Sequence, residues 1–378
     1  MKVSYNYEME ENVFEAVVVH TGLPASIECE LIVVPVFDGE TTETSFFSEL
    51  DAATGGEIGQ AILRGEFHPN GKDCFITPVI GDAWKARRVA LVGVGSKDSM
   101  GWRPAAAKIV MTARSSQIRE VGFLVRGEID VNGFAQAITE GMLFGSFENR
   151  RYKTGDRADE SHGEEISLNV LCGERGKAPV AEGVKRGVAI GTSGNLAREL
   201  SNEPPNLLTP TVFAERARAI VSDQGVEVEV LDEAAIKSLG MGMILGVAQG
   251  SAEPPRLVVM KHNPSDAPSH PVLALVGKGV TFDTGGISIK PSADMDQMKH
   301  DMGGGAAVVG AMRAIAALQL PIRVIGIVPM VENMPGGKAI RPGAVSYTHL
   351  RAHETEAELV CGLLHEKKRG GGGGGGGG

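Results

Sequence analysis

The residues with the clearest chemical potential gather between Lys278 and Asp301, in a stretch otherwise rich in glycine. Asp283 and Asp301 supply carboxylates, and Lys278 and Lys290 supply amines. Carboxylates that converge from different turns are the ligands that hard divalent cations prefer. A lysine beside such ions either neutralises the carboxylates or coordinates a metal as the neutral amine. These residue types therefore allow a metal site, and they equally allow a solvated glycine loop with ordinary salt bridges.

The segments on either side of this stretch are those of an α/β protein. The apolar run 272–276 is long enough for a buried strand and too short for a helix. Gly277 breaks the run, and the glycines at 303–305 open an alanine-rich segment that predicts a helix over 304–318. A strand, a polar glycine loop and a helix in succession are typical of α/β proteins, which keep their sites at the carboxyl ends of strands.

Two strings in this region resemble a known family. GKGVTFDTGGISIKP at 277–291 and MKHDMGGGAAV at 298–308 resemble the catalytic segment of the leucyl aminopeptidase family, the two-metal cytosolic exopeptidases. Segments 195–210 and 328–343 are similar to the family's lead-in to its catalytic domain and to the segment that follows. The resemblance covers roughly the first nine-tenths of the chain, weakly before about residue 140 and strongly after about residue 190.

The resemblance implies a role for five residues. Lys278 is similar to the lysine that ligates one metal, Asp283 to the bridging carboxylate, and Asp301 to a further metal-ligating aspartate. Lys290 is similar to the second lysine, which polarises the scissile carbonyl, and Met298 matches a position in the pocket for the substrate's first side chain. The implied cofactors are two divalent metal ions, Zn²⁺ or Mn²⁺. The implied reaction releases leucine and other N-terminal residues from peptides through a metal-activated water.

The chain departs from the family's pattern after residue 343. The family continues from Arg-Pro-Gly-Asp to Asn-Thr-Asp-Ala-Glu-Gly-Arg, which supplies an aspartate ligand, a glutamate ligand and an arginine that holds a bicarbonate. Here Ala344 replaces the first aspartate, and no such string follows. The string TEAE at 355–358 has a related pattern but arrives about four residues early. We therefore expect little or no turnover from this chain, and whether Glu356 or Glu358 replaces the missing ligands stays open.

Residues 344–378 are interpreted as a non-native tail. Segment 344–369 is polar without a clear period, and 370–378 is a run of nine glycines, which buries no surface and predicts disorder. His349, His353 and His365 are metal ligands by type alone, and we interpret them as exposed tail residues. The incomplete ligand set leaves a second hypothesis open, a catalytically dead family member that acts in assembly or partner binding. Release of leucine from a leucyl amide distinguishes the two.

Length and composition narrow the class of protein. The chain has 378 residues, 42% of them hydrophobic and 22% charged, which is ordinary for a soluble globular protein of two or three domains. A net charge of -10 and a pI near 5.5 disfavour nonspecific binding to nucleic acid or anionic membranes. The four cysteines form no CxxC pair, so neither a zinc ribbon nor a redox motif is indicated. Without an apolar signal region or a membrane-length apolar run, we expect a cytoplasmic protein with free thiols.

The order of the expected elements predicts two α/β domains, each with a mostly parallel or mixed sheet flanked by helices, the second one incomplete. Residues 1–150 are interpreted as a non-catalytic amino-terminal domain, 151–177 as a linker with a connecting strand, and 178–343 as a partial metallopeptidase domain. The lone Gly93-Val94-Gly95 after a strand predicts a tight turn rather than a nucleotide loop. The partner implied is a peptide substrate, and the resemblance implies a homo-hexamer for the intact family.

The pattern of apolar residues also predicts individual elements. Expected strands are 13–19, 31–37, 73–80, 88–94, 121–126, 166–172, 226–231, 256–261, 272–276 and 322–329. Expected helices are 46–64, 104–118, 133–147, 178–201, 211–223, 232–239 and 304–318. Thr209 is expected to cap the helix that begins at Pro210.

Overall fold

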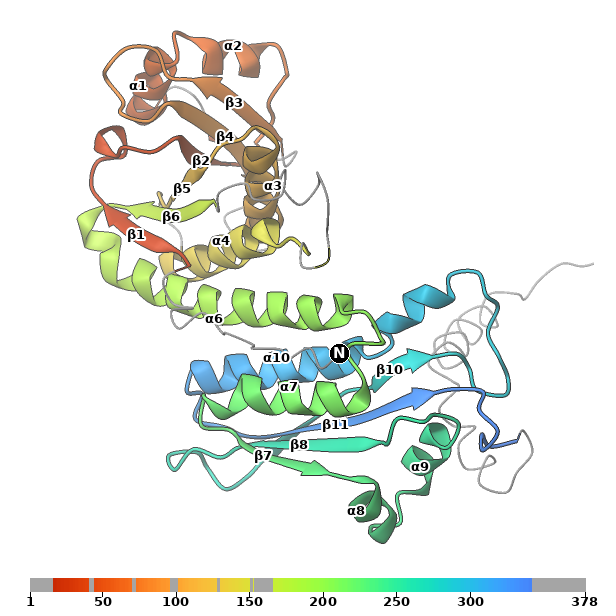
Figure 1. Cartoon of the computed structure of the whole chain (residues 1–378). Coiled ribbons are helices and arrows are strands. Elements are labelled where there is room, and N and C mark those ends of the chain that lie inside the picture. Colours follow the sequence, from red (N-terminus) through yellow and green to blue (C-terminus); the bar gives the residue numbers. More distant parts are fainter. Residues whose placement is uncertain are drawn as a thin grey trace, which may run out of the picture. The chain divides into compact units, whose positions relative to one another are not determined.

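The computed structural model describes residues 16–40, 44–69, 73–95, 101–127, 130–149, 152 and 166–341. The chain divides into two compact units, Met1–Glu199 and Leu200–Gly378, and each contains one β-sheet flanked by helices (Figure 1). The predicted α/β class is therefore confirmed. The domain boundaries at residues 150 and 178 stay predictions. Residues 151 and 153–165 of the predicted linker 151–177, the start of the strand 13–19, the string at 355–358 and the tail histidines lie outside the described residues.

The first unit is organised around a six-stranded sheet. Its strands are β1 (Val18–Thr21), β2 (Leu31–Phe37), β3 (Cys74–Pro78), β4 (Arg88–Gly95), β5 (Glu120–Leu124) and β6 (Ser167–Cys172). The spatial order is β1-β6-β5-β2-β4-β3, and every neighbouring pair is parallel except β3 with β4. All seven residues of β2 are buried, because a central strand covered on both faces reads as one continuous apolar run.

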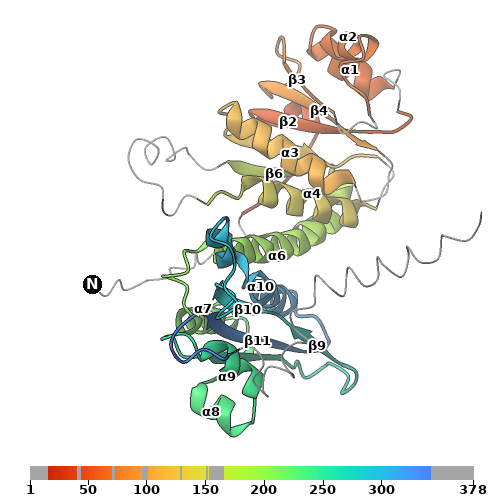
Figure 2. The same ribbon diagram turned by 90° about the vertical axis from the view of Figure 1, so that its right-hand side faces the viewer.

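Helices cover both faces of this sheet. They are α1 (Ser45–Ala53), α2 (Glu57–Leu63), α3 (Trp102–Ser115), α4 (Val131–Ser146) and α6 (Lys177–Asn202), with short 3₁₀ turns η2 (Pro24–Ser26) and η4 (Glu174–Gly176). Figure 2 shows α1 and α2 on one side of the sheet and α3 and α4 on the other. The single helix expected over 46–64 is wrong. Gly55 and Gly56 adopt left-handed φ values of 69° and 85°, which end α1 and start α2.

Cys29 gives this unit a testable chemical property. Its side chain is 5% exposed, and burial raises the pKa of its thiol to about 11. A rise from 9.0 to about 11 lowers the thiolate fraction about 100-fold. We therefore expect iodoacetamide to alkylate Cys29 at pH 8 at least about 100-fold more slowly in the folded chain than in guanidinium. Peptide mass spectrometry measures both rates, and equal rates would contradict the burial of this thiol.

The second unit contains a mixed sheet. Its strands are β7 (Glu227–Leu231), β8 (Arg256–His262), β9 (Val272–Val276), β10 (Gly279–Asp283) and β11 (Arg323–Asn333). Both β9 and β10 pair with β11 in parallel, while β8 runs antiparallel to β11 and to β7. β9 pairs with Arg323–Ile327 and β10 with Met330–Asn333, so the two short strands follow one another along the same side of β11. Strand β10 corrects the expectation of a loop directly after Gly277.

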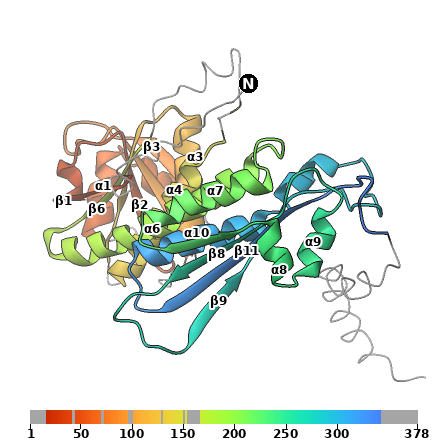
Figure 3. The same ribbon diagram turned by 60° about the horizontal axis from the view of Figure 1, so that its bottom comes forward.

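Helices and turns of the second unit surround this sheet. They are α7 (Pro210–Ser222), α8 (Glu233–Ser238), α9 (Gly242–Ala248), η5 (Met295–His300) and α10 (Gly303–Ala317). Figures 1 and 3 show α7 and α10 over one face, and α8 and α9 near one end of the other. The predicted cap of α7 is confirmed, because Thr209 accepts a hydrogen bond from the amide of Val212 and Pro210 is the first helical residue. Throughout the described ranges, no helix has the length and apolarity needed to cross a membrane.

Strand β9 lies at the edge of the sheet beside β11 (Figure 3). Three of its apolar side chains are exposed, Val272 at 42%, Leu273 at 50% and Val276 at 70%. Within the part of the chain that the structure describes, β9 pairs with β11 alone. Its other edge therefore carries backbone groups for which the described residues supply no partner strand.

Candidate active site

Lys278 lies where β9 gives way to β10. The amide of Gly277 donates to the carbonyl of Ile327 (3.0 Å), and the carbonyl of Lys278 accepts from the amide of Gly305 (2.7 Å). This places the first turn of α10 directly against the strand junction. The contact is so close that a Cβ on Gly277 would lie 2.3 Å from the carbonyl oxygen of Gly304. Only glycine permits this approach.

The same contact brings Asp301 to Lys278. Asp301 closes η5, two residues before α10 begins, and its amide donates to the carbonyl of Met298 (3.3 Å). Its Oδ1 lies 3.1 Å from Lys278 Nζ. Helix α10 and turn η5 therefore act together to position one carboxylate beside one amine.

Asp283 is the last residue of β10, and its carboxylate accepts three hydrogen bonds. The Oδ1 atom accepts from the amide of Gly285 (2.9 Å) and from Asn333 Nδ2 (2.7 Å), and Oδ2 accepts from Lys290 Nζ (2.8 Å). Gly285 and Gly286 turn the chain sharply with φ values of 85° and 67°, and the amide of Lys290 donates to the carbonyl of Thr284 (2.9 Å). The turn, which starts after Asp283, thus brings the Lys290 side chain back to the Asp283 carboxylate.

The structure brings together the five residues that the sequence singled out. Lys290 Nζ also lies 3.0 Å from the Met298 sulfur, so η5 contacts the Asp283 turn as well. Asp283 and Asp301 are close enough for each charge to affect the other. Over the described residues, however, no group of three or more His, Cys, Asp and Glu side chains is arranged to hold a metal ion. Among the described residues, the polar network consists of the carboxylates of Asp283 and Asp301 and the amines of Lys278 and Lys290.

The two carboxylates differ in their electrostatics. Burial raises the pKa of Asp283, but hydrogen bonds from Lys290 and Gly285, the Lys290 charge and the Asn333 amide outweigh burial and hold the pKa below its ordinary value. Burial also raises the pKa of Asp301, the charge of Lys278 opposes it, and Asp283 adds to the rise, so the pKa of Asp301 stays above its ordinary value. Asp283 is thus stabilised as an anion, whereas Asp301 is an anion held at a cost.

One atom of Asp301 indicates what the network can accept. Its Oδ2 is fully buried and has no hydrogen-bond partner among the described residues. A buried carboxylate oxygen without a donor costs free energy, unless a cation or another donor satisfies it. Together with Asp283 and the amine of Lys278, this oxygen fits a divalent cation by the chemistry of its donors. The donors that fit such a cation among the described residues are Asp283, Asp301 and Lys278.

Sequence reasoning missed the contribution of Asn333. From the sequence, Glu332 and Asn333 are polar residues of the turn before Pro335; in the structure, the Asn333 side chain donates to Asp283. Glu332 accepts from the hydroxyl of Ser251 at 2.6 Å. No local signal marks Asn333, because its contact with Asp283 exists only after β10 pairs with β11.

Among the described residues, the side chains of the nearby Asp294 and Asp296 do not hydrogen-bond to this network. Asp294 stands at the cap position of η5 with a left-handed φ of 58°, and its side chain accepts no capping bond. Asp296 accepts from the side chain of its neighbour Gln297 at 3.0 Å. Asp294 therefore occupies the cap position of η5 without capping it through its side chain, and Asp296 lies within η5.

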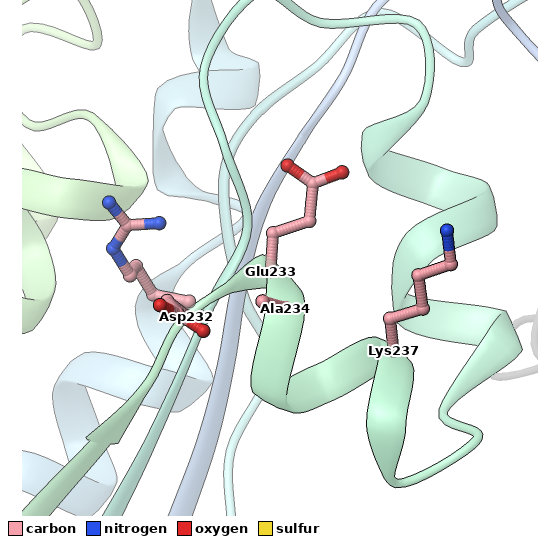
Figure 4. A pocket seen from close by; sticks show the side chains of 5 residues that line it. Asp232, Glu233, Ala234 and Lys237 are labelled. Atoms are coloured by element: carbon pink, nitrogen blue, oxygen red, sulfur yellow. The ribbon is translucent and has the colours of Figure 1, made fainter.

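A separate hollow lies at the start of α8. It has a volume of about 370 Å³ and is lined by Asp232, Glu233, Ala234, Lys237 and Arg256. Figure 4 shows that the Glu233 and Lys237 side chains do not converge on one point. Asp232 is occupied as the helix cap, because its Oδ1 accepts from the amide of Ala235 (2.9 Å). This hollow therefore offers no assembled chemistry.

Comparison with protein families matches both parts of the chain. Residues 195–356 match the catalytic domain of the cytosol aminopeptidase family, and residues 33–156 match the amino-terminal domain of the same family. A probable cytosol aminopeptidase of Solibacter usitatus is 41% identical over 322 residues, covering 84% of this chain and 63% of the relative. One from Geobacter sp. (strain M21) is 37% identical over 348 residues, covering 88% of this chain and 69% of the relative. This chain thus spans about two-thirds of these relatives' length.

Two solved structures have a similar fold. The bottromycin maturation enzyme BotP in complex with Mn superposes with a TM-score of 0.66 at 31% identity, covering 83% of this chain and 62% of that one. A mutant of tomato leucine aminopeptidase superposes with a TM-score of 0.72 at 26% identity, covering 86% of this chain and 64% of that one. One similar structure therefore contains manganese.

Proposed function

The chain belongs to the cytosol aminopeptidase family, and on this basis we propose that it carries the metal-dependent peptidase site of an enzyme that releases N-terminal residues from peptides. The observation that carries the proposal is the network around Asp283. Four residues predicted to serve the chemistry lie within one set of polar contacts, Lys278 to Asp301 at 3.1 Å and Lys290 to Asp283 at 2.8 Å. A solvated glycine loop with ordinary salt bridges would have no need to bring these four side chains together.

In the proposed site, Asp283, Asp301 and Lys278 hold divalent cations, of which the manganese in BotP makes Mn²⁺ the first candidate. When bound, such ions lower the pKa of a water molecule and make hydroxide available at neutral pH. Lys278 is 57% exposed, so solvent can take the proton that its amine must lose before it coordinates a metal. The unpartnered Oδ2 of Asp301 and the anionic Asp283 supply the negative charge that attracts the cation.

Lys290 is proposed to act as a cation, whereas Lys278 is proposed to bind a metal as a neutral amine. Its ammonium group donates a hydrogen bond to the anionic Asp283 carboxylate at 2.8 Å. A protonated amine beside the reacting carbonyl stabilises the oxyanion that develops during attack. We propose that Lys290 supplies this charge, and that Met298, which lies 3.0 Å from Lys290, contacts the substrate's first side chain.

For the 378-residue chain itself we propose weak or absent turnover, since Ala344 and the residues after it depart from the family's ligand pattern. The alternative function, a catalytically dead member used for assembly or partner binding, rests on the same departure. We propose a cytoplasmic location on the names of the cytosol aminopeptidase relatives. The homo-hexamer implied for the intact family stays a prediction.

A chimera tests whether this chain carries the catalytic half of the enzyme. Residues 1–343 are joined to the remaining carboxy-terminal part of the Solibacter usitatus relative. We expect Mn²⁺-dependent release of p-nitroaniline from leucine p-nitroanilide, and a loss of at least about 100-fold in kcat for Lys290→Met, because an oxyanion-stabilising charge is removed.

The native chain and the relative are assayed beside the chimera. A folded chimera without release would refute the proposed function. Release that Lys290→Met leaves unchanged would refute the role of Lys290. Turnover of the native chain equal to that of the relative would refute the expectation that its ligand set is incomplete.

A further inference from the structure

We propose that Asn333 is a positioning residue for the metal site, holding the Asp283 carboxylate so that Oδ2 faces the cation and Oδ1 faces the protein. This inference rests on the proposed function and deepens it, because it names a residue outside the motif that determines how the motif's carboxylate is presented. The residue lies at the end of β11, and its Nδ2 donates to Asp283 Oδ1 at 2.7 Å.

Both the backbone and the side chain of Asn333 are held in place by neighbouring residues. Its backbone carbonyl accepts from both the amide (3.0 Å) and the hydroxyl (2.8 Å) of Thr284, the residue that follows Asp283. Its side-chain oxygen lies against Gly286, where an added Cβ would be 2.7 Å away. Gly286 has a left-handed φ of 67°, and its amide donates to the Thr284 hydroxyl at 3.3 Å. Asn333 therefore has little freedom to move away from Asp283.

The hydrogen bonds at Asp283 distinguish its two oxygens. A carboxylate oxygen has two lone pairs. On Oδ1, both are used by the protein, one by the amide of Gly285 and one by Asn333 Nδ2. On Oδ2, the bond from Lys290 is the contact that the structure describes, at 2.8 Å. Capacity to bind a cation is therefore left on Oδ2.

Asn333 is the element of this arrangement that a side-chain substitution can remove. The terminal torsion of an aspartate is broad, so the carboxylate plane is determined by its hydrogen bonds rather than by a rotamer well. Without Asn333, Oδ1 keeps one bond, from the Gly285 amide, and Oδ2 keeps the bond from Lys290, whose long side chain can follow a rotated carboxylate. The Asn333 bond comes from an amide held in place by Thr284 and Gly286, so it restricts this rotation. Residues that orient a metal ligand in this way change metal affinity about 10- to 100-fold when they are removed.

The test compares two variants of the full chain that disturb the same turn. Asn333→Ala removes the amide bond to Asp283 and retains the backbone bonds from Thr284. Thr284→Val is the matched control, because it removes a hydroxyl that donates to the Asn333 carbonyl and accepts from the Gly286 amide, and removes none of the hydrogen bonds to the Asp283 carboxylate. Mn²⁺ affinity is measured by isothermal titration calorimetry, and Co²⁺ is added to each chain to record the visible absorption spectrum of the bound ion. The spectrum reports ligand geometry, which a change of stability alone does not alter.

We expect Asn333→Ala to weaken Mn²⁺ binding at least about 10-fold and to change the Co²⁺ spectrum, while Thr284→Val keeps the affinity within about threefold and the spectrum unchanged. Equal affinity and spectrum in Asn333→Ala would overturn the inference and leave the proposed function standing. Equal losses in both variants would also overturn it, since the effect would belong to the turn. A wild-type chain that binds neither ion overturns this inference, while the chimera decides the proposed function separately. Asn333→Ser is measured alongside, so that poor folding of the alanine variant does not decide the result.

Discussion

Replacing Asp283 with asparagine is expected to destabilise the metal-free chain by about 2–4 kcal/mol and to abolish its Mn²⁺ binding. Three donors converge on this carboxylate, from Gly285, Asn333 and Lys290. In the variant, the Lys290 ammonium loses its counter-charge, and an amide group with two N–H donors faces groups that are themselves donors. Urea denaturation with and without Mn²⁺ measures both effects.

The pH dependence of this loss has a definite sign. The folded-state pKa of Asp283 lies below its ordinary value of 3.8, so the stability that it contributes is present above the unfolded-state pKa and is lost as pH falls through the folded-state pKa. The gap between wild type and Asp283→Asn is therefore expected to be largest near neutral pH and to close below about pH 4. A gap that persisted unchanged in acid would contradict the charge argument.

Asp301→Asn is the informative comparison, because the pKa of Asp301 is shifted the other way. Because the folded-state pKa of Asp301 lies above its ordinary value, ionising Asp301 costs the folded chain stability once the pH rises above the unfolded-state pKa. Its partner Lys278 is 57% exposed and returns to solvent easily when the charge is removed. Asparagine at 301 should therefore keep the metal-free stability at pH 7 or raise it by up to about 1 kcal/mol, while also losing Mn²⁺ binding. The two substitutions thus separate stability from metal binding.

Gly250→Ala is expected to cost about 3 kcal/mol of stability and to weaken Mn²⁺ binding in the same chain. A Cβ on Gly250 would lie 1.9 Å from the carbonyl oxygen of Met334, and one on Gly336 would lie 2.1 Å from the carbonyl oxygen of Gly250. The two backbones touch, so neither can yield by turning a side chain. Displacement of Met334 moves its neighbour Asn333, and with it the hydrogen bond to Asp283.

Gly337→Ala provides the control for this effect. An added Cβ at Gly337 meets no atom within 4 Å, so we expect its stability to stay within about 0.5 kcal/mol of wild type. Thermal unfolding and Mn²⁺ calorimetry on the two variants check both outcomes. Equal stability of Gly250→Ala and Gly337→Ala would refute the close backbone contact.

The candidate site could be predicted from the sequence because most of its residues belong to one continuous segment. Lys278 lies at the junction of β9 and β10, Asp283 ends β10, Lys290 lies in the turn that follows, and Asp301 ends η5 just before α10, with glycines at the points of closest approach. The motif therefore specifies the residues and much of their local geometry together. Their catalytic and metal-binding roles stay predictions.

Contacts between distant segments could not be predicted in this way. Asn333 is separated from Asp283 by 50 positions, and their hydrogen bond depends on the register between β10 and β11. That register follows from how the whole sheet packs. A single sequence therefore identified Asn333 only as a polar residue before Pro335.

Two elements were mispredicted for local reasons. The expected helix 46–64 spans Gly55 and Gly56, whose left-handed backbone a helix cannot contain. Strand β10 is short and is bounded by Gly279 and Asp283, residues that are depleted in strands, so its polar ends resembled a loop. Parallel pairing with β11 outweighs these weak local preferences.

The exposed side of β9 has a consequence for how this protein is handled in bulk. The strand reads VLALV. It contains no charged residue or proline, the residues that usually prevent another polypeptide from pairing with an exposed edge strand. Peptide groups with no neighbour in the described part of the chain act as a template for any extended polypeptide nearby. We therefore expect this strip of five residues to promote self-association as the protein concentration rises.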